Sequence, residues 1–326
     1  MVYHEIAVEP TAIEDFKDLS LLERQFGFDV GRLISFMPAK PKEIRCWKTL
    51  FYEHLKTNLP PEKHKDLELR VIAFLERAIY RSRNRSALDD GQSWCDLALQ
   101  EDAIKHFSAI LCEGPSSNSA ILPFQGLHDP DETFPDFLFK PIHFADSMKD
   151  PEVFLESLRP LISSAKRLHI IDPHFDPAHP EEPNRRRWQA TVRKLSEFLR
   201  DANRLTIDIH FNTQADRTRN PKEFVTDIGS RIVGLFPPST KLFVSAWSKK
   251  HQSINWHARY LITDKAGVAL DYGFDMGKDR RTDVTLLPRD KACEKLAEFN
   301  PETPTIFTLE ATIQRTGTRA AGFDVG

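Results

Sequence analysis

Hydrophobic positions recur with different periods in the two halves of this 326-residue chain. Between about residues 12 and 112 they recur mostly every three or four residues, the period of an amphipathic helix. The Pro-Pro pair in the segment 58–62 separates two such stripes, because proline interrupts a helix. The stripes consist of Trp47, Leu50, Phe51 and Leu55, and of Leu67, Val71, Phe74, Leu75 and Ala78. The pattern predicts a mainly helical N-terminal domain.

From about residue 142 onward, short apolar runs alternate with helical patterns. Strands separated by helices of roughly a dozen residues indicate βαβ units, and we expect a mixed, largely parallel sheet flanked by helices. Helices are expected at 151–162, 186–199 and 224–236. Strands are expected at 166–172, 205–211, 241–248, 256–263, 268–272, 284–287 and 305–309, the fifth pairing back on the fourth as a hairpin.

A change of composition separates the two patterns. The stretch 113–140 contains EGPSSNS and HDPDETFPDF, which are rich in Gly, Ser, Asp and Pro. The sequence therefore predicts a helical domain over residues 1–140 and an α/β domain over residues 141–326. We expect the helical domain to recruit substrate or a protein partner.

Composition narrows the class of protein. With 40% hydrophobic and 29% charged residues, the chain has a soluble, globular profile. No apolar run has the roughly 20 residues of a transmembrane helix, and the first residues lack the basic and apolar regions of a secretory signal. The four cysteines are scattered without a C-x-x-C pair, which gives no zinc motif and favours a reducing, cytoplasmic location.

The distribution of charge allows nucleic acid to bind at local basic clusters, but the net charge of the whole molecule does not attract it. The net charge is −3, so the molecule as a whole is no electrostatic trap for phosphates. Basic clusters are nevertheless present, each either a phosphate contact or simply a solvated surface. They are Arg81/Arg83/Arg85, Arg185/Arg186/Arg187 and Lys278/Arg280/Arg281.

The stretch 257–264 carries the most distinctive chemistry. His257 and Arg259 are two residues apart in an expected strand, so they lie on one face of it. An imidazole beside a guanidinium is suited to binding or attacking a phosphate. Asp264 follows at the end of the strand, where it could orient a basic group or form an ordinary turn. The alternative for His257 is a structural, partly buried strand histidine.

His257, Arg259 and Asp264 match the spacing of the H-x-K-x4-D motif, and on these residues the chain resembles the phospholipase D superfamily. The segment Ile171-Asp-Pro-His-Phe-Asp-Pro also looks like that family's first core strand and its following turn. The resemblance covers about residues 142–310. Three features depart from the family: arginine replaces lysine, Gly273-Phe-Asp275-Met-Gly277 replaces the Gly-Ser-x-Asn segment, and one motif copy is present instead of two.

The resemblance implies a metal-independent phosphodiesterase or nuclease that cuts DNA or RNA through a histidine nucleophile. It implies a homodimer that supplies the second histidine, and Asp283 as the acidic residue that orients the histidine. By analogy, a prokaryotic defence setting is expected. The alternative is a catalytically degenerate module that binds phosphate groups of nucleic acid or lipid headgroups within a protein assembly, as in some membrane-remodelling proteins with this domain.

Further substrate-binding residues are expected around the same site. His174 and Asp176 follow a predicted parallel strand, where α/β sheets bind ligands, and Arg280 and Arg281 belong to a basic cluster. The loop with His174, Asp176, His179 and Glu181 also suggests a metal, but its spacing matches no standard zinc motif. We therefore expect neither a metal nor a cofactor. Trp256 and Tyr272 could stack on a base or pack in the core.

Overall fold

The structure is a computed structural model in which the chain forms two compact units, Tyr3–Ile142 and His143–Gly326. For residues 143–145, 151–152 and 183–187 it describes the backbone only. The described residues are 2–38, 46–81, 91–114, 118–140, 143–145, 151–176, 183–199, 205–213, 220–251, 253–254, 256–271, 273–274, 283–303 and 305–316.

The first unit is built on a five-stranded sheet in which every pair of neighbouring strands is parallel. The strand order is β3-β2-β1-β4-β5. The prediction of a mainly helical N-terminal domain is therefore wrong. The strands are β1 His4–Val8, β2 Arg32–Ser35, β3 Ile79–Tyr80, β4 Ala109–Cys112 and β5 Ile121–Pro123.

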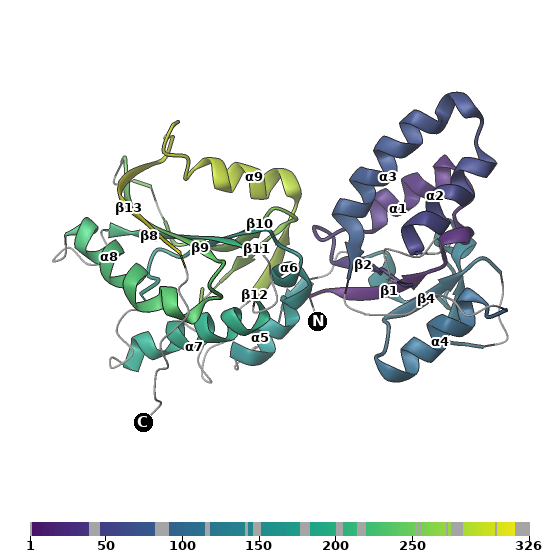
Figure 1. Cartoon of the computed structure of the whole chain (residues 1–326), viewed down its shortest axis with the longest axis horizontal. Helices are drawn as coiled ribbons and strands as arrows, with labels where there is room; N and C mark the ends of the chain where they lie inside the picture. The colour runs from purple at the N-terminus through teal and green to yellow at the C-terminus, as the bar shows by residue number, and fades with distance from the viewer. Residues whose placement is uncertain are drawn as a thin grey trace. The chain divides into compact units, whose positions relative to one another are not determined.

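The helices of this unit cover both faces of the sheet. In Figure 1, α1, α2 and α3 lie on one face and α4 lies on the other. The apolar stripe of α3 is confirmed, because Leu67, Val71, Phe74 and Ala78 are buried. The helices are α1 Phe16–Gln25, α2 Trp47–Asn58, α3 His64–Ala78 and α4 Trp94–Ile104, with 3-10 turns η1 Pro10–Ala12, η2 Pro61–Lys63, η3 Phe124–Leu127 and η4 Asp136–Leu138.

One buried cation fixes the end of the first unit. Arg32 is 5% exposed, and burial lowers its pKa. Its Nη1 donates hydrogen bonds to the carbonyl oxygens of Phe137 at 3.1 Å and Lys140 at 3.0 Å, and its Nε donates to the carbonyl of Gln25. The segment up to Lys140 is thus bound to β2.

The second unit contains an eight-stranded mixed sheet with the order β13-β9-β8-β7-β10-β11-β12-β6. An α/β class is confirmed, but the sheet is not largely parallel. Among the described strands, two neighbouring pairs are parallel, and five are antiparallel. The strands are β6 His143–Ala145, β7 Arg167–Ile171, β8 Thr206–Asn212, β9 Lys241–Lys249, β10 Arg259–Thr263, β11 Gly267–Leu270, β12 Asp283–Leu287 and β13 Phe307–Thr316.

Short connections explain the antiparallel half. A helical crossover separates β7 from β8 and β8 from β9, which makes those pairs parallel. Three residues separate β10 from β11, so these strands form the expected hairpin.

Helices cover both faces of the second sheet, with α7 and α8 on one face and α9 on the other (Figure 1). Ile171, Ile262 and Ala292 of α9 share one apolar cluster. The helices are α5 Pro151–Ser157, α6 Arg159–Ser163, α7 Pro183–Phe198, α8 Pro221–Ile232 and α9 Arg289–Ala297, with a 3-10 turn η6 Val233–Leu235. Among the helices that the structure describes, none combines the length and the apolar composition of a membrane span.

Candidate functional site

The candidate site lies at one edge of the second sheet. β10 pairs antiparallel with β7, with Tyr260 opposite Ile171. The first residues of β10 therefore lie beside the last residues of β7, at the edge where β8 and β9 also end. The carboxyl ends of parallel strands are the usual place for a ligand in α/β sheets.

Asp172 is the first residue after β7, and its carboxylate organises this edge. It is 2% exposed and accepts backbone N–H groups from His174 at 3.0 Å and Phe274 at 3.1 Å. Burial raises the pKa of Asp172, whereas the two N–H donors and the charge of Arg259 act in the opposite direction. One buried carboxylate thus connects two turns that are 100 residues apart in sequence.

Arg259 begins β10 and is held on two sides. Its Nη1 donates a hydrogen bond of 2.8 Å to the carbonyl oxygen of Asp271, and its Nε lies 3.8 Å from Oδ1 of Asp172. The side chain is 20% exposed, and its buried Nε has no hydrogen-bond partner among the described residues. The guanidinium is therefore held through Nη1, beside the Asp172 carboxylate, and the side chain remains partly exposed.

Gly273 allows this close packing. Its φ of +69° lies in the left-handed region, which favours glycine. A Cβ at this position would collide with the carboxylate of Asp172 and lie 2.7 Å from Cδ of Arg259. The glycine of the Gly273-Phe-Asp275 segment is thus required by the packing of Asp172 against Arg259.

Two histidines and a second aspartate lie at the same edge of the sheet as Arg259. His257 is exposed, two residues before β10. His174 is also exposed, in a turn closed by a 3.2 Å hydrogen bond from the N–H of Phe175 to the carbonyl of Asp172. Asp176 is buried, with 6% of its surface exposed. All three follow or precede neighbouring strand ends, so the structure gathers His174, Asp176 and His257 at one edge.

The structure separates the two other predicted aspartates. Asp283 begins β12, whose Val284 pairs with Leu270, and it is exposed at the same edge as Arg259. Asp264 lies at the opposite end of β10, about 17 Å along the strand. Its Oδ1 accepts the N–H groups of Lys166 at 2.7 Å and Arg167 at 3.3 Å. Asp264 therefore holds the start of β7, away from His257 in the same chain.

Several predicted residues lie outside the described part of the chain. These are Arg280 and Arg281, together with His179, Glu181, Tyr272 and Asp275. Trp256 is buried, and its ring lies 4.5 Å from that of Phe307. Core packing, the second of the two predicted roles, therefore describes Trp256.

A second polar cluster, which the sequence analysis missed, lies on the α9 side of the sheet. His169 of β7 pairs with Asp208 of β8, and His210 follows two residues later. His169 Nδ1 lies 3.2 Å from His210 Nε2, and Arg167 donates two hydrogen bonds to Asp208 at 2.7 and 2.8 Å. Burial lowers the pKa of His169, and it lowers that of His210 to about 3. The available signal was the alternation of polar residues within the apolar run 206–212.

The donor atoms of His169, Asp208 and His210 lie within 4.8 Å of one another, as a metal site requires. Their hydrogen bonds oppose that use. Trp247 Nε1 donates to His210 Nδ1 at 3.1 Å, so neutral His210 carries its proton on Nε2, the atom that faces His169. Arg167 occupies both oxygens of Asp208. The cluster fits a network of neutral histidines better than a metal centre.

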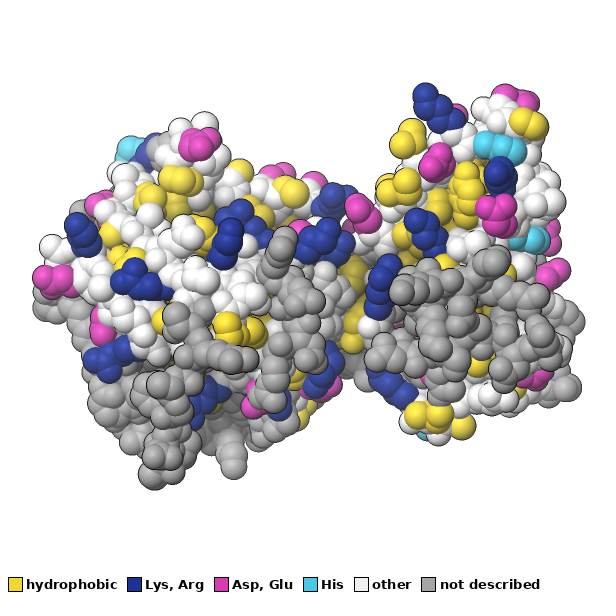
Figure 2. Space-filling view, viewed as in Figure 1, with side chains coloured by type: hydrophobic (Ala, Val, Ile, Leu, Met, Phe, Trp, Pro, Cys, Tyr) yellow, Lys and Arg dark blue, Asp and Glu magenta, His cyan; other side chains and the backbone are white. Residues whose placement is uncertain are grey.

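The face of the molecule shown in Figure 2 is electrostatically mixed where it is described. On the face shown in Figure 2, Lys and Arg side chains of the described residues are interspersed with acidic and apolar ones and form no continuous basic patch. Binding of a phosphate by the described residues of this face would therefore rest on a few local groups. Comparison of the sequence with protein-family models found no match, and comparison with curated proteins found none either.

Proposed function

We propose that the second unit is a metal-independent phosphodiesterase that acts on nucleic acid, as the resemblance to the phospholipase D superfamily implies. The observation that carries the proposal is the arrangement at the end of β7. Arg259 is fixed by Asp172 and the Asp271 carbonyl, and two exposed histidines lie close in sequence to this pair: His174 two residues after Asp172, and His257 two residues before Arg259. A planar guanidinium donates two parallel hydrogen bonds to phosphate oxygens, which suits it to this role.

In the proposed reaction His257 attacks phosphorus and forms a phosphorus–nitrogen bond. The bond from phosphorus to the leaving oxygen breaks, and protonated His174 gives that oxygen its proton. A water molecule then loses a proton to His174 and attacks phosphorus, and the bond to His257 breaks. The products are a phosphate monoester and an alcohol. Arg259 stabilises the charge on the oxygens that take no part in bond breaking, and Asp283 at the same edge orients a histidine.

The position of His174 changes the expectation of a shared site. The turn after β7 supplies a second histidine from the same chain, beside the strand that follows His257. A homodimer that combines two copies of His257 remains the alternative source of the acid. A substrate with a good leaving group, such as a nitrophenyl phosphodiester, needs no proton from the acid. His174→Ala should therefore release nitrophenol in the first turnover nearly as fast as wild type does, while losing later turnovers, which need His174 as the base, and activity on DNA or RNA.

A second candidate function is phosphate binding without hydrolysis. The contacts of Arg259 favour it, because part of the charge of Arg259 is offset by Asp172 and one N–H is used by the Asp271 carbonyl. In this case the edge would hold a phosphate of nucleic acid or of a lipid headgroup within a protein assembly. The two functions share Arg259 and differ in their dependence on His257.

The decisive experiment uses the full chain in parallel reactions with and without EDTA. Wild type and His257→Ala are incubated with labelled single- and double-stranded DNA and RNA and with anionic lipid vesicles, and His106→Ala, an exposed histidine of the first unit, is the control. Cleavage by wild type and the control, absent in His257→Ala, supports the enzyme. Binding that depends on Arg259 without cleavage supports the second candidate. Cleavage that disappears in EDTA would contradict the metal-independent mechanism.

A further inference from the structure

The first unit has its own natural ligand position, independent of the function proposed for the second. β1 has β2 and β3 on one side and β4 and β5 on the other, so the strand order reverses between β1 and β4. In an open parallel sheet, the carboxyl edge at such a reversal is where ligands and reactive groups are usually found. The residues just beyond β1 and at the end of β4 therefore hold the strongest candidate for chemistry in this unit.

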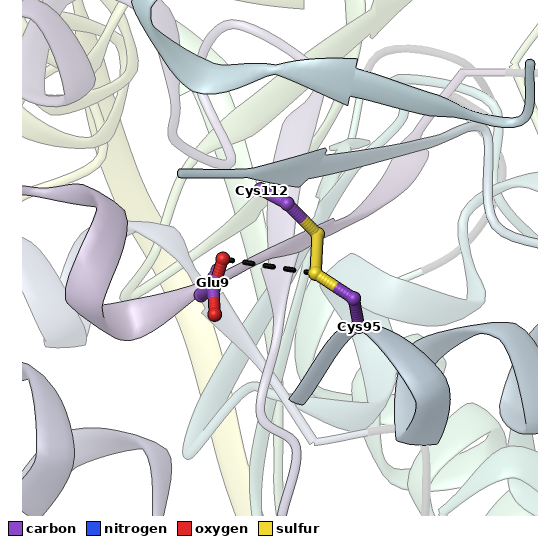
Figure 3. Close-up of side chains that lie close together, drawn as sticks. All are labelled: Glu9, Cys95 and Cys112. Carbon is purple, nitrogen blue, oxygen red and sulfur yellow. Dashed lines mark hydrogen bonds between the residues drawn. A yellow bond between two sulfur atoms is a disulfide. The ribbon is translucent and has the colours of Figure 1, made fainter. Parts of the chain in front are cut away.

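Three reactive side chains meet at this position (Figure 3). Glu9 directly follows β1, Cys112 ends β4, and Cys95 is the second residue of α4. Cys95 and Cys112 are joined by a disulfide. Glu9 Oε2 lies 3.7 Å from Sγ of Cys95 and accepts the backbone N–H of Glu113 at 2.8 Å. A hydrogen bond at the end of β4 thus aims the carboxylate of Glu9 at the sulfur.

The two sulfurs differ in access. Cys112 is buried, with 2% of its surface exposed, whereas Cys95 is partly exposed in the first turn of an 11-residue helix. Backbone N–H groups in the first turn of a helix stabilise a negative charge, so Cys95 is the better placed of the two to react as a thiolate. The two remaining cysteines, Cys46 and Cys293, are free thiols.

We propose that Cys95 and Cys112 form a reversible redox pair that exchanges disulfides with a low-molecular-weight thiol, with Cys95 as the reacting sulfur and Glu9 as its proton acceptor. For oxidation by glutathione disulfide, the Cys95 thiol passes its proton to Glu9, and its sulfur attacks one glutathione sulfur and releases a glutathione thiolate. Cys112 then loses its proton and attacks Cys95, which releases the second glutathione. Two electrons pass from the pair to glutathione disulfide, and both protein protons end on the two glutathiones.

The environment of Glu9 suits proton transfer. Burial raises the pKa of Glu9, while the N–H of Glu113 acts in the opposite direction. A carboxylate whose pKa is moved towards neutrality is a better base for a thiol than an exposed one. The same three side chains have donor atoms within 4.8 Å of one another. When the cysteines are reduced, this set could alternatively hold Zn²⁺, and the experiment distinguishes the two uses.

The test equilibrates the full chain with defined ratios of reduced and oxidised glutathione, alkylates free thiols and measures each cysteine by peptide mass. The pair should convert together between dithiol and disulfide, while Cys46 and Cys293 never join a disulfide within the chain. Cys112→Ser should accumulate glutathione on Cys95, whereas Cys95→Ser should capture little on Cys112. Glu9→Gln should slow exchange at pH 7 about 10-fold or more, and Glu14→Gln, an exposed neighbour, should not.

Four outcomes would overturn the proposal in whole or in part. If Cys95 and Cys112 remained free thiols at every glutathione ratio, they would not form a redox pair. Equal capture of glutathione by the two serine variants would contradict Cys95 as the reacting sulfur. An unchanged rate of disulfide exchange in Glu9→Gln would contradict Glu9 as the proton acceptor. One equivalent of Zn²⁺ bound by the reduced protein, blocking oxidation and lost in Cys95→Ser, would assign a metal site instead. Because the serine variants and wild type are compared directly, the test stands even where Glu9→Gln fails to fold.

Discussion

The indole Nε1 of Trp247 donates a hydrogen bond of 3.1 Å to Nδ1 of His210 inside the second sheet. His210 is 6% exposed, and its ring lies 5.2 Å from that of Phe299. The arrangement requires a neutral imidazole, because a proton on Nδ1 would face the indole N–H. Burial accordingly lowers the pKa of His210 from 6.5 to about 3.

This hydrogen bond predicts that the protein loses stability in mild acid. Below pH 6.5 the unfolded chain protonates His210, whereas the folded chain resists protonation until about pH 3. The contribution of His210 to the free energy of unfolding is therefore fully present above pH 6.5. It falls between pH 6.5 and pH 3 by about 1.4 kcal/mol per pH unit, the value for one proton. Urea unfolding at several pH values measures the slope. His210→Gln should reduce it and His106→Gln should not; equal slopes in all three proteins would refute the assignment.

The carboxylate of Asp172 should be needed for the local fold of the site. The two carboxylate oxygens of Asp172 accept the backbone N–H groups of His174 and Phe274. Asp172→Asn keeps the shape of the side chain but replaces one of these oxygens by an N–H₂ group, so that two donors face each other. We expect a loss of about 1–3 kcal/mol of stability and weaker phosphate binding. Asp271→Asn is the matched control, since Arg259 contacts its backbone carbonyl. Chemical denaturation and phosphate titration of the two variants would show whether they differ.

The glycine at position 273 should tolerate no side chain. Gly273→Ala places a methyl group against Asp172 and Arg259 in a backbone conformation that costs about 1–2 kcal/mol for L-residues. Gly234→Ala is the control, because no other atom lies within 4 Å of the added Cβ there. We expect thermal unfolding at a lower temperature for the first variant alone. A Gly273→Ala protein as stable as wild type would mean that the turn adopts another conformation.

The disulfide of the first unit should contribute to stability under oxidising conditions. It joins residues separated by 17 positions, and closing a loop of this length stabilises a fold by about 3 kcal/mol in the chain-entropy model. Adding a reductant should destabilise wild type by about that amount and leave Cys95→Ser unaffected. Unfolding curves with and without reductant measure the difference. A reductant effect of equal size in Cys95→Ser would assign it elsewhere.

The sequence predicted the second unit well because its strands and helices carry clear periodic signals. The helix predicted for 186–199 is α7, Pro183–Phe198, and the strand predicted for 241–248 is β9, Lys241–Lys249. The direction of the strands was less accessible. β10, β11 and β12 follow each other without helices, and their antiparallel pairing outweighs the two parallel pairs around β8.

The strands of the first unit escaped prediction for a physical reason. All four residues of β2 and of β4 are buried, so neither strand alternates between buried and exposed positions. The short apolar run of β4 resembles a buried helix segment when only periodicity is considered, and β2 offers only two apolar residues, Leu33 and Ile34. The strong stripes of α2 and α3 between β2 and β3 then dominated the pattern.

The candidate site was partly visible in the sequence. His257 and Arg259 stand out by their spacing, and His174 by its place after an apolar run. Asp172 was overlooked, because an aspartate before proline looks like an ordinary turn residue. Its role depends on Phe274 and Arg259, which approach it only after folding. The Cys95–Cys112 pair was equally hidden, since 17 positions, including most of α4, separate the two cysteines in sequence.

The hydrogen bonds of Arg32 to the carbonyls of Phe137 and Lys140 determine where a fragment that contains only the first unit should end. A fragment that ends before Phe137 would remove two carbonyl acceptors and leave a buried guanidinium without them. A buried charged group without hydrogen-bond partners destabilises the fold by several times the free energy that a solvent-exposed hydrogen bond or ion pair contributes. Fragments that extend through Lys140 should therefore express as folded protein, and those cut earlier should aggregate. The boundary between fragments of the two units should therefore be chosen from the contacts of Arg32, after Lys140, and not from the Pro-rich composition of the preceding stretch.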